Sequence, residues 1–105
     1  MIQINIITKD REQAEEITTL LFEERLVVNE FIINDMTGRN PNERGNLTSE
    51  KEVLIVGTTK ALLFNAIDEL LQLKYGEHMP VIYAIPIVYM NSKQSDYLRQ
   101  NTAKV

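Results

Sequence analysis

The chain has 105 residues, 44% of them hydrophobic and 25% charged, which is typical of one globular domain. Its net charge of −4 argues against nucleic-acid binding, because a phosphate polymer repels an acidic protein on average. The absence of cysteine excludes disulfides, thiol catalysis and thiolate metal sites. We find no secretory pattern and no apolar run of about 18 residues, so we expect a cytoplasmic protein outside the membrane.

The first elements predicted along the chain are a strand and a helix. Ile2, Ile4 and Ile6 alternate with polar residues, and a period of two is typical of a strand. Asp10 is placed to cap a helix, with Gln13 three residues later to reach back toward the cap. The apolar positions of this helix are Ala14, Ile17, Leu20 and Leu21.

A second strand is predicted over residues 26–33, where "LVVNEFII" is rich in β-branched side chains. Residues 34–50 then break the pattern with two glycines, a proline and four asparagines. Most loops in compact domains have about 4–6 residues, so a loop this long is functional, partly disordered or hides a hairpin.

A third strand follows at residues 52–58, and Thr58 or Thr59 is placed to cap a second helix. Gly76 is placed to end that helix. Its apolar stripe is Leu63, Ala66, Ile67, Leu70 and Leu71. A fourth strand is predicted over residues 81–89, and a short last helix starts near Ser95.

The order of elements is β-α-β-β-α-β, the split βαβ pattern. We therefore predict one ferredoxin-like α+β domain over residues 1–105: a two-layer sandwich with a four-stranded antiparallel sheet and a short C-terminal helix. The first and third strands are central in that topology. Pro86 fits an edge position for the fourth strand, because proline is tolerated mainly at sheet edges.

Two helices cover only one face of such a sheet, yet residues 53–56 and 81–85 are apolar on both faces. A solvated face would show polar alternation, and a large exposed apolar patch usually marks an interface. We therefore predict that the second face is buried by oligomerisation. The alternative is a monomer in which the long loop and the C-terminus cover this face.

Several segments resemble the divalent-cation tolerance (CutA) family, small trimeric relatives of the PII signalling proteins. The most specific are Glu-Arg-Leu at the end of the first helix, the two prolines Pro80 and Pro86, and the closing Asp-Tyr-Leu. The similar segments are "TKDREQAEEITTLLFEERLV", "EVLIVGTTKALLFNAIDELL", "PVIYAIPI" and "SDYL". The resemblance implies the same ferredoxin-like fold, a homotrimer with sheets facing each other, and a role in divalent-cation tolerance.

The chain departs from the family pattern where the family is tied to copper. Asn29 stands where family members often carry a cysteine, and the family's His-Pro-Tyr is replaced by Tyr-Gly-Glu, with His78 displaced by a few residues. The aromatic-rich hairpin of the family is replaced by an aromatic-free loop at residues 34–50. These departures indicate a divergent member whose metal-site features are altered or lost.

Glu77 and His78 are the candidate metal ligands, for copper or zinc bound weakly. A metal site needs three or four ligands, and two adjacent residues do not easily point at one ion. Asp35 or Glu50 of another chain would have to complete the site across an interface. The alternative is a helix stop and strand start in which His78 is a solvated turn residue.

Arg39 and Arg44 in the long loop, with Lys60 at the start of the second helix, are the candidate anion-binding residues. They are the basis of an alternative function, a PII-like signalling protein that binds a nucleotide or small anion between subunits and touches a partner through loop 34–50. The residues Gly57–Lys60 lack the spacing of a phosphate-binding P-loop. No nucleophile and base pair is apparent, so we predict a non-catalytic protein.

Overall fold

The computed structural model describes residues 1–104 and confirms the predicted ferredoxin-like α+β order. The strands are β1 (Ile2–Thr8), β2 (Val28–Pro41), β3 (Leu47–Thr59) and β4 (Val81–Pro86). The helices are α1 (Arg11–Glu23), α2 (Phe64–Tyr75) and α3 (Ser92–Asn101), with short 3₁₀ turns η1 (Ala61–Leu63) and η2 (Gly76–His78) on either side of α2. No helix in this part of the chain is long and apolar enough to cross a membrane.

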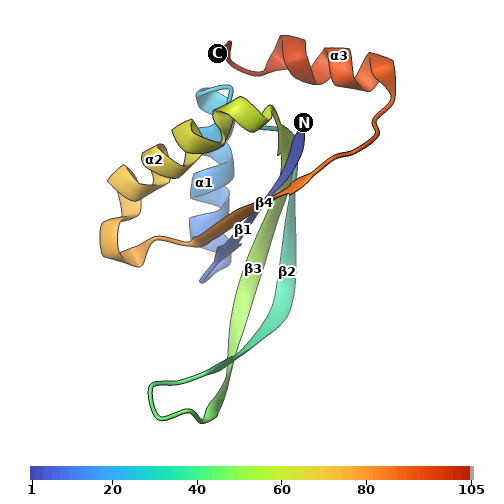
Figure 1. Cartoon of the computed structure of the whole chain (residues 1–105). Coiled ribbons are helices and arrows are strands. Elements are labelled where there is room, and N and C mark those ends of the chain that lie inside the picture. Colours follow the sequence, from blue (N-terminus) through green and yellow to red (C-terminus); the bar gives the residue numbers. More distant parts are fainter. Residues whose placement is uncertain (105) are drawn as a thin grey trace.

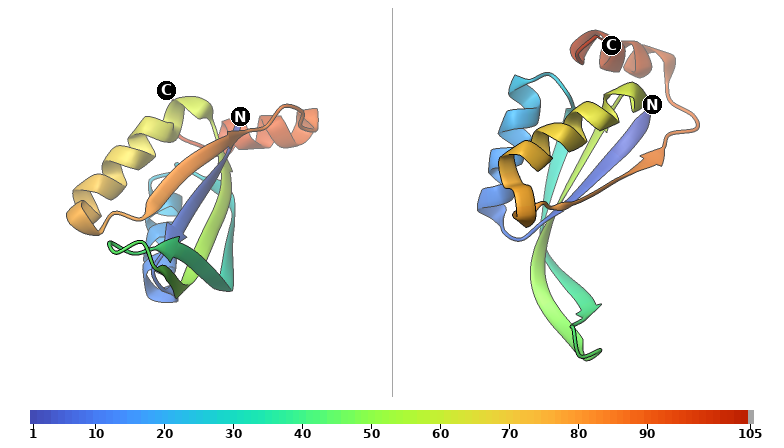
Figure 2. Two further views of the ribbon diagram at one scale, coloured as in Figure 1. Left: turned by 60° about the horizontal axis from the view of Figure 1, so that its bottom comes forward. Right: turned by 60° about the vertical axis from the view of Figure 1, so that its left-hand side comes forward.

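The sheet is antiparallel with the strand order β2-β3-β1-β4, so β1 and β3 are central as predicted. Helices α1 and α2 cover one face of it, while α3 lies past the end of the sheet near the N-terminus (Figures 1 and 2). The single core lies between the helical layer and the sheet. Its fully buried members include Ile4, Ile6, Ile17, Leu21, Ile55, Ile67 and Leu71.

Two of the three predicted helix ends and caps of α1 and α2 are confirmed, and one is wrong. Asp10 caps α1, because its Oδ1 accepts a hydrogen bond from the Gln13 amide at 2.8 Å, as predicted. Gly76, with φ of 54°, ends α2, also as predicted. The predicted threonine cap of α2 is wrong: the buried Thr59 hydroxyl donates to the Leu26 carbonyl instead, and the chain enters α2 through η1.

Residues 34–50 form the outer part of a long β2–β3 hairpin, so the hairpin alternative for this loop is the correct one. β2 continues to Pro41, and a second register shift next to Asp35, which has φ of 59°, lets the pairing resume beyond Ile33. Asn42 closes the turn, since its Oδ1 accepts from the amides of Arg44 and Asn46, each at 2.9 Å. The hairpin projects well past the helices (Figure 1).

The C-terminal elements differ from prediction at their boundaries. β4 ends at Pro86 rather than at Tyr89, since beyond one last bond from the Ile87 amide to the Met1 carbonyl (3.0 Å) the chain leaves the sheet. α3 begins at Ser92, earlier than predicted. Asn91 caps it, because its Oδ1 accepts from the amides of Lys93 and Gln94 at 3.0 and 3.2 Å.

The sheet face opposite α1 and α2, called the open face below, carries the unpartnered apolar residues that the sequence predicts. Cross-strand register places these side chains in adjacent rows, with polar Gln3, Asn5 and Thr58 among them. The large apolar side chains that stay exposed there are Phe31 (64%), Val81 (56%), Tyr83 (45%), Ile85 (45%) and Ile33 (44%). Within residues 1–104 the C-terminal segment borders one end of this face, where Met90 and Tyr97 share a groove with Phe31, but the five apolar side chains stay 44–64% exposed. The cover proposed in the monomer alternative is therefore incomplete in this part of the chain.

Candidate functional site

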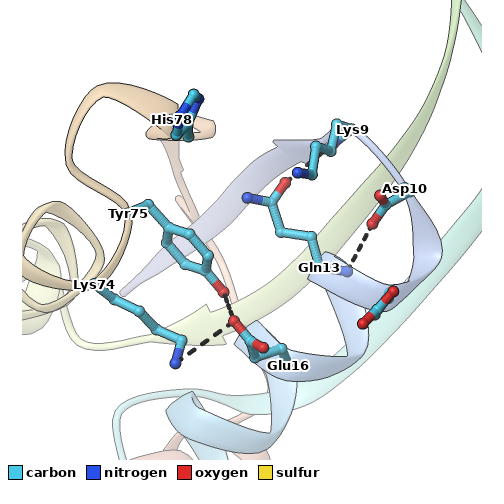
Figure 3. A pocket seen from close by; sticks show the side chains of 8 residues that line it. Lys9, Asp10, Gln13, Glu16, Lys74, Tyr75 and His78 are labelled. Carbon is cyan, nitrogen blue, oxygen red and sulfur yellow. Dashed lines mark hydrogen bonds and ion pairs between the residues drawn. The ribbon is translucent and has the colours of Figure 1, made fainter.

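A cavity of about 310 Å³ lies between the first turns of α1 and the end of α2 (Figure 3). It contains the only histidine of the chain and is lined almost entirely by polar and charged side chains. The lining residues are Lys9, Asp10, Glu12, Gln13, Glu16, Lys74, Tyr75 and His78. Helix capping shapes one wall, because the buried Gln13 reaches back and its Oε1 accepts from the Lys9 amide at 3.1 Å.

Glu16 is the centre of a three-residue cluster on one side of this cavity. The Tyr75 hydroxyl donates to Glu16 Oε1 at 2.6 Å, and Lys74 Nζ lies 3.5 Å from the same oxygen (Figure 3). The hydrogen bond from Tyr75, followed by the charge of Lys74, lowers the pKa of Glu16 below its ordinary value. Burial, and then the bond to Glu16 and its charge, raise the pKa of Tyr75.

His78 lies apart from this cluster, at the end of η2, and its side chain is exposed (Figure 3). Glu77 is also exposed and does not line the cavity. A second groove brings His78 and Glu50 onto a shared surface. Nevertheless, within residues 1–104 no three His, Cys, Asp or Glu side chains gather closely enough to hold one ion. The side chains of one chain therefore do not fit a complete metal centre.

The three candidate anion-binding residues are not brought together within one chain. Arg39 pairs with Ser49 on the outer hairpin, and Arg44 lies in the hairpin turn. Lys60 follows β3 at its other end, roughly 35 Å from Arg39 at the rise of a strand and farther from Arg44. Lys60 Nζ is already engaged, since it donates to the carbonyls of Ala103 and Thr102 at 2.9 and 3.4 Å.

The Glu16 cluster was not predicted from the sequence. Glu16 and Tyr75 are 59 residues apart, and each is an ordinary surface residue of its own helix. Only the packing of α1 beside α2 on the same sheet face brings them together (Figure 1). The predicted topology placed both helices on one face of the sheet. From that topology one could have expected the start of α1 and the end of α2 to lie close together, which is where Glu16 and Tyr75 are found.

Replacing Tyr75 by phenylalanine is expected to raise the pKa of Glu16 toward its ordinary value, because the shortest hydrogen bond to its carboxylate is lost. A depressed carboxylate pKa stabilises the fold above the unfolded-state pKa, and this contribution disappears as pH falls through the folded pKa. The variant should therefore lose less stability on acidification than the wild type. Carbon-13 NMR titration of Glu16 measures the shift, and Tyr97→Phe is the matched control that should leave Glu16 unchanged.

The CutA1 divalent ion tolerance protein family matches residues 2–101. Among solved structures, the chain is similar to the divalent cation tolerance protein of Thermus thermophilus, with 28% identity and a TM-score of 0.88 over 98% of this chain and 100% of that one. It is also similar to a variant of CutA1 from Pyrococcus horikoshii (24% identity, TM-score 0.89, covering 99% and 100%). CutA1 from Oryza sativa shares the fold at 19% identity (TM-score 0.90, covering 99% and 94%). No curated protein matches the chain.

An antiparallel β2-β3-β1-β4 sheet with two helices on one face defines a ferredoxin-like α+β protein. The chain belongs to the CutA1 divalent ion tolerance family. The resemblance found in the sequence is thereby confirmed.

Proposed function

We propose that this protein is a non-catalytic homotrimer that acts in tolerance of divalent cations, with at most weak metal affinity of its own. The open face supports association of the chains, and the number of three chains comes from the family resemblance. Five large apolar side chains are exposed on one side of the sheet, and burying each is worth about 1.5–3 kcal/mol. Packing such faces together removes this surface from water, as the family resemblance implies.

Weak metal affinity follows from the ligands. His78 and Glu77 are exposed neighbours. Glu50 of the same chain shares a groove with His78, but within residues 1–104 no three such side chains form a metal-binding group, so a further ligand would have to come from another chain. A site with one or two water-exposed ligands binds zinc or copper more weakly than a closed tetrahedral site with four protein ligands. The cytoplasmic location stays a prediction, and a relative from Archaeoglobus fulgidus is described as periplasmic.

Zinc or copper at about 1 mM is expected to raise the melting temperature of the wild type by about 2–3 °C. This is the shift expected when the metal concentration is about equal to a Kd of about 1 mM. His78→Ala should remove the shift, whereas Glu43→Ala, at the hairpin tip, should keep it. A rise several times larger would reveal a complete metal centre and contradict weak affinity. A shift unaffected by His78→Ala would place metal contact elsewhere.

A PII-like role is the second candidate, and one observation favours it. Register places Arg39 and Lys51 on the same face of the projecting hairpin, where they are free to contact an anionic group. In this reading a nucleotide or small anion binds between subunits, and Arg44 in the hairpin turn adds to the positive charge. ATP or ADP should then raise the melting temperature, and Arg39→Ala should reduce that gain.

A further inference from the structure

A second cavity, of about 600 Å³, lies where the end of α1, the start of β2 and α3 meet. It is separate from the His78 cavity, with which it shares no lining residue. Glu30 of β2 lines it, and the rings of Phe22 from α1 and Tyr97 from α3 lie on its walls. These three side chains come from different elements, so the tertiary fold creates their arrangement.

Glu30 is a half-buried carboxylate without a partner in the described chain. The first register shift of β2, at Asn29 with φ of 54°, precedes it and places it beside Gly57 of β3. Its Oε1 is enclosed and receives no hydrogen bond from residues 1–104. An enclosed carboxylate oxygen that accepts no hydrogen bond destabilises the fold, and such atoms are rare in native structures.

The charged groups that line the cavity do not neutralise Glu30. Glu23, at the end of α1, has the same charge. Arg25 is the one cation on the lining, and its guanidinium donates to the Gln100 carbonyl at 3.0 Å. From α3 the cavity receives Tyr97 and Asn101, which are uncharged. Burial alone raises the pKa of Glu30 to about 7.

The wall chemistry matches an organic cation better than a metal ion. Phe22 is 71% exposed and Tyr97 is 52% exposed, and both residues line the same cavity as Glu30. Aromatic faces attract ammonium and guanidinium groups, and a carboxylate adds a charge-assisted hydrogen bond. A divalent metal would need three or four ligand atoms, and no such group forms within residues 1–104.

We propose that this cavity binds an ammonium or guanidinium group, with Glu30 as its anionic partner and Phe22 and Tyr97 as its aromatic walls. The group belongs either to a small organic amine or to a lysine or arginine of a second copy of the chain. Both sources present the same chemistry to Glu30. The proposal goes beyond the role in divalent-cation tolerance and does not depend on it.

The test uses n-butylammonium and n-butylguanidinium as probes and n-butanol as the uncharged control. Binding is followed by the NMR signals of the Phe22 and Tyr97 rings and of the Glu30 carboxyl carbon. We expect saturable binding of the cations, not of butanol, with affinity about tenfold higher at about pH 8 than at about pH 6, because Glu30 must be ionised. Glu30→Gln should weaken binding at least tenfold, whereas Glu23→Gln should change it less than about twofold.

The two sources give different results. If a second copy supplies the cation, the probes do not bind, the pKa of Glu30 in the assembled protein lies below its ordinary value, and Glu30→Gln weakens assembly about tenfold or more. If a small amine is the ligand, assembly is unchanged in Glu30→Gln. The proposal is overturned if Glu30 titrates near pH 7 in the assembled protein with and without the probes, or if Glu30→Gln binds them as tightly as the wild type.

Discussion

Replacing Phe31 by glutamate is expected to dissociate the assembly into monomers that keep their fold. In the single chain Phe31 is 64% exposed, so a carboxylate there remains solvated and destabilises the monomer little. In a trimer each interface would lose about 2 kcal/mol of apolar burial and would also enclose an unpaired charge, so the dissociation constant should rise more than about 1,000-fold. Sedimentation velocity measures the assembly, and circular dichroism measures the fold.

Leu73→Glu is the matched control for this prediction. Leu73 is 87% exposed on α2 and lies in the helical layer, away from the open face. The same change of charge and apolar area should therefore leave the assembly intact. If Phe31→Glu and Leu73→Glu assemble alike, the open face is not the surface through which the chains associate.

Replacing Gly57 by alanine is expected to lower the free energy of unfolding by about 1–2 kcal/mol. A Cβ at this position in β3 would overlap Cγ1 of Val27, a branched side chain that is 3% exposed, so the backbone or Val27 must shift. Such overpacking costs about 1–3 kcal/mol, and the gain of about 0.5–1 kcal/mol from a less flexible unfolded chain only partly offsets it. Urea unfolding monitored by circular dichroism gives the difference.

Gly38→Ala provides the comparison for Gly57→Ala. A Cβ at Gly38 also meets an occupied position, but the atoms there belong to the carboxylate end of Glu52. This end is flexible and can rotate toward solvent, so we expect a change within about 0.5 kcal/mol. Equal destabilisation by both substitutions would show that a glycine-specific strand geometry, and not contact with Val27, decides the effect.

The fold followed from the sequence because its helices and central strands repeat clear periods. The alternating isoleucines of β1 and the Ile67–Leu71 stripe of α2 both face the core, as predicted. The outer hairpin was less predictable. Its side chains are mostly exposed, so its sequence does not show the alternation of apolar and polar residues that marks a half-buried strand. Asn42 and Gly45 form the turn, and strand pairing from Met36 to Pro41 depends on a bulge that cannot be recognised in the residue pattern.

The candidate sites were less predictable than the fold for a physical reason. His78 and Glu77 are local neighbours that the sequence shows directly, but their missing ligands depend on tertiary or quaternary contacts. Glu30 is one polar residue within the second strand predicted over residues 26–33, and it was not among the residues singled out from the sequence. Its enclosure depends on the bulge at Asn29 and on the approach of α3, and neither is visible in the composition of residues 26–33.

Sedimentation velocity of the wild-type protein at micromolar concentration shows whether the chains associate through the open face of the sheet. We expect one species with about three times the 12.1 kDa mass of a single chain. A stable species of 12.1 kDa would contradict this expectation, because Phe31, Val81 and Tyr83 would then remain exposed to water without a partner.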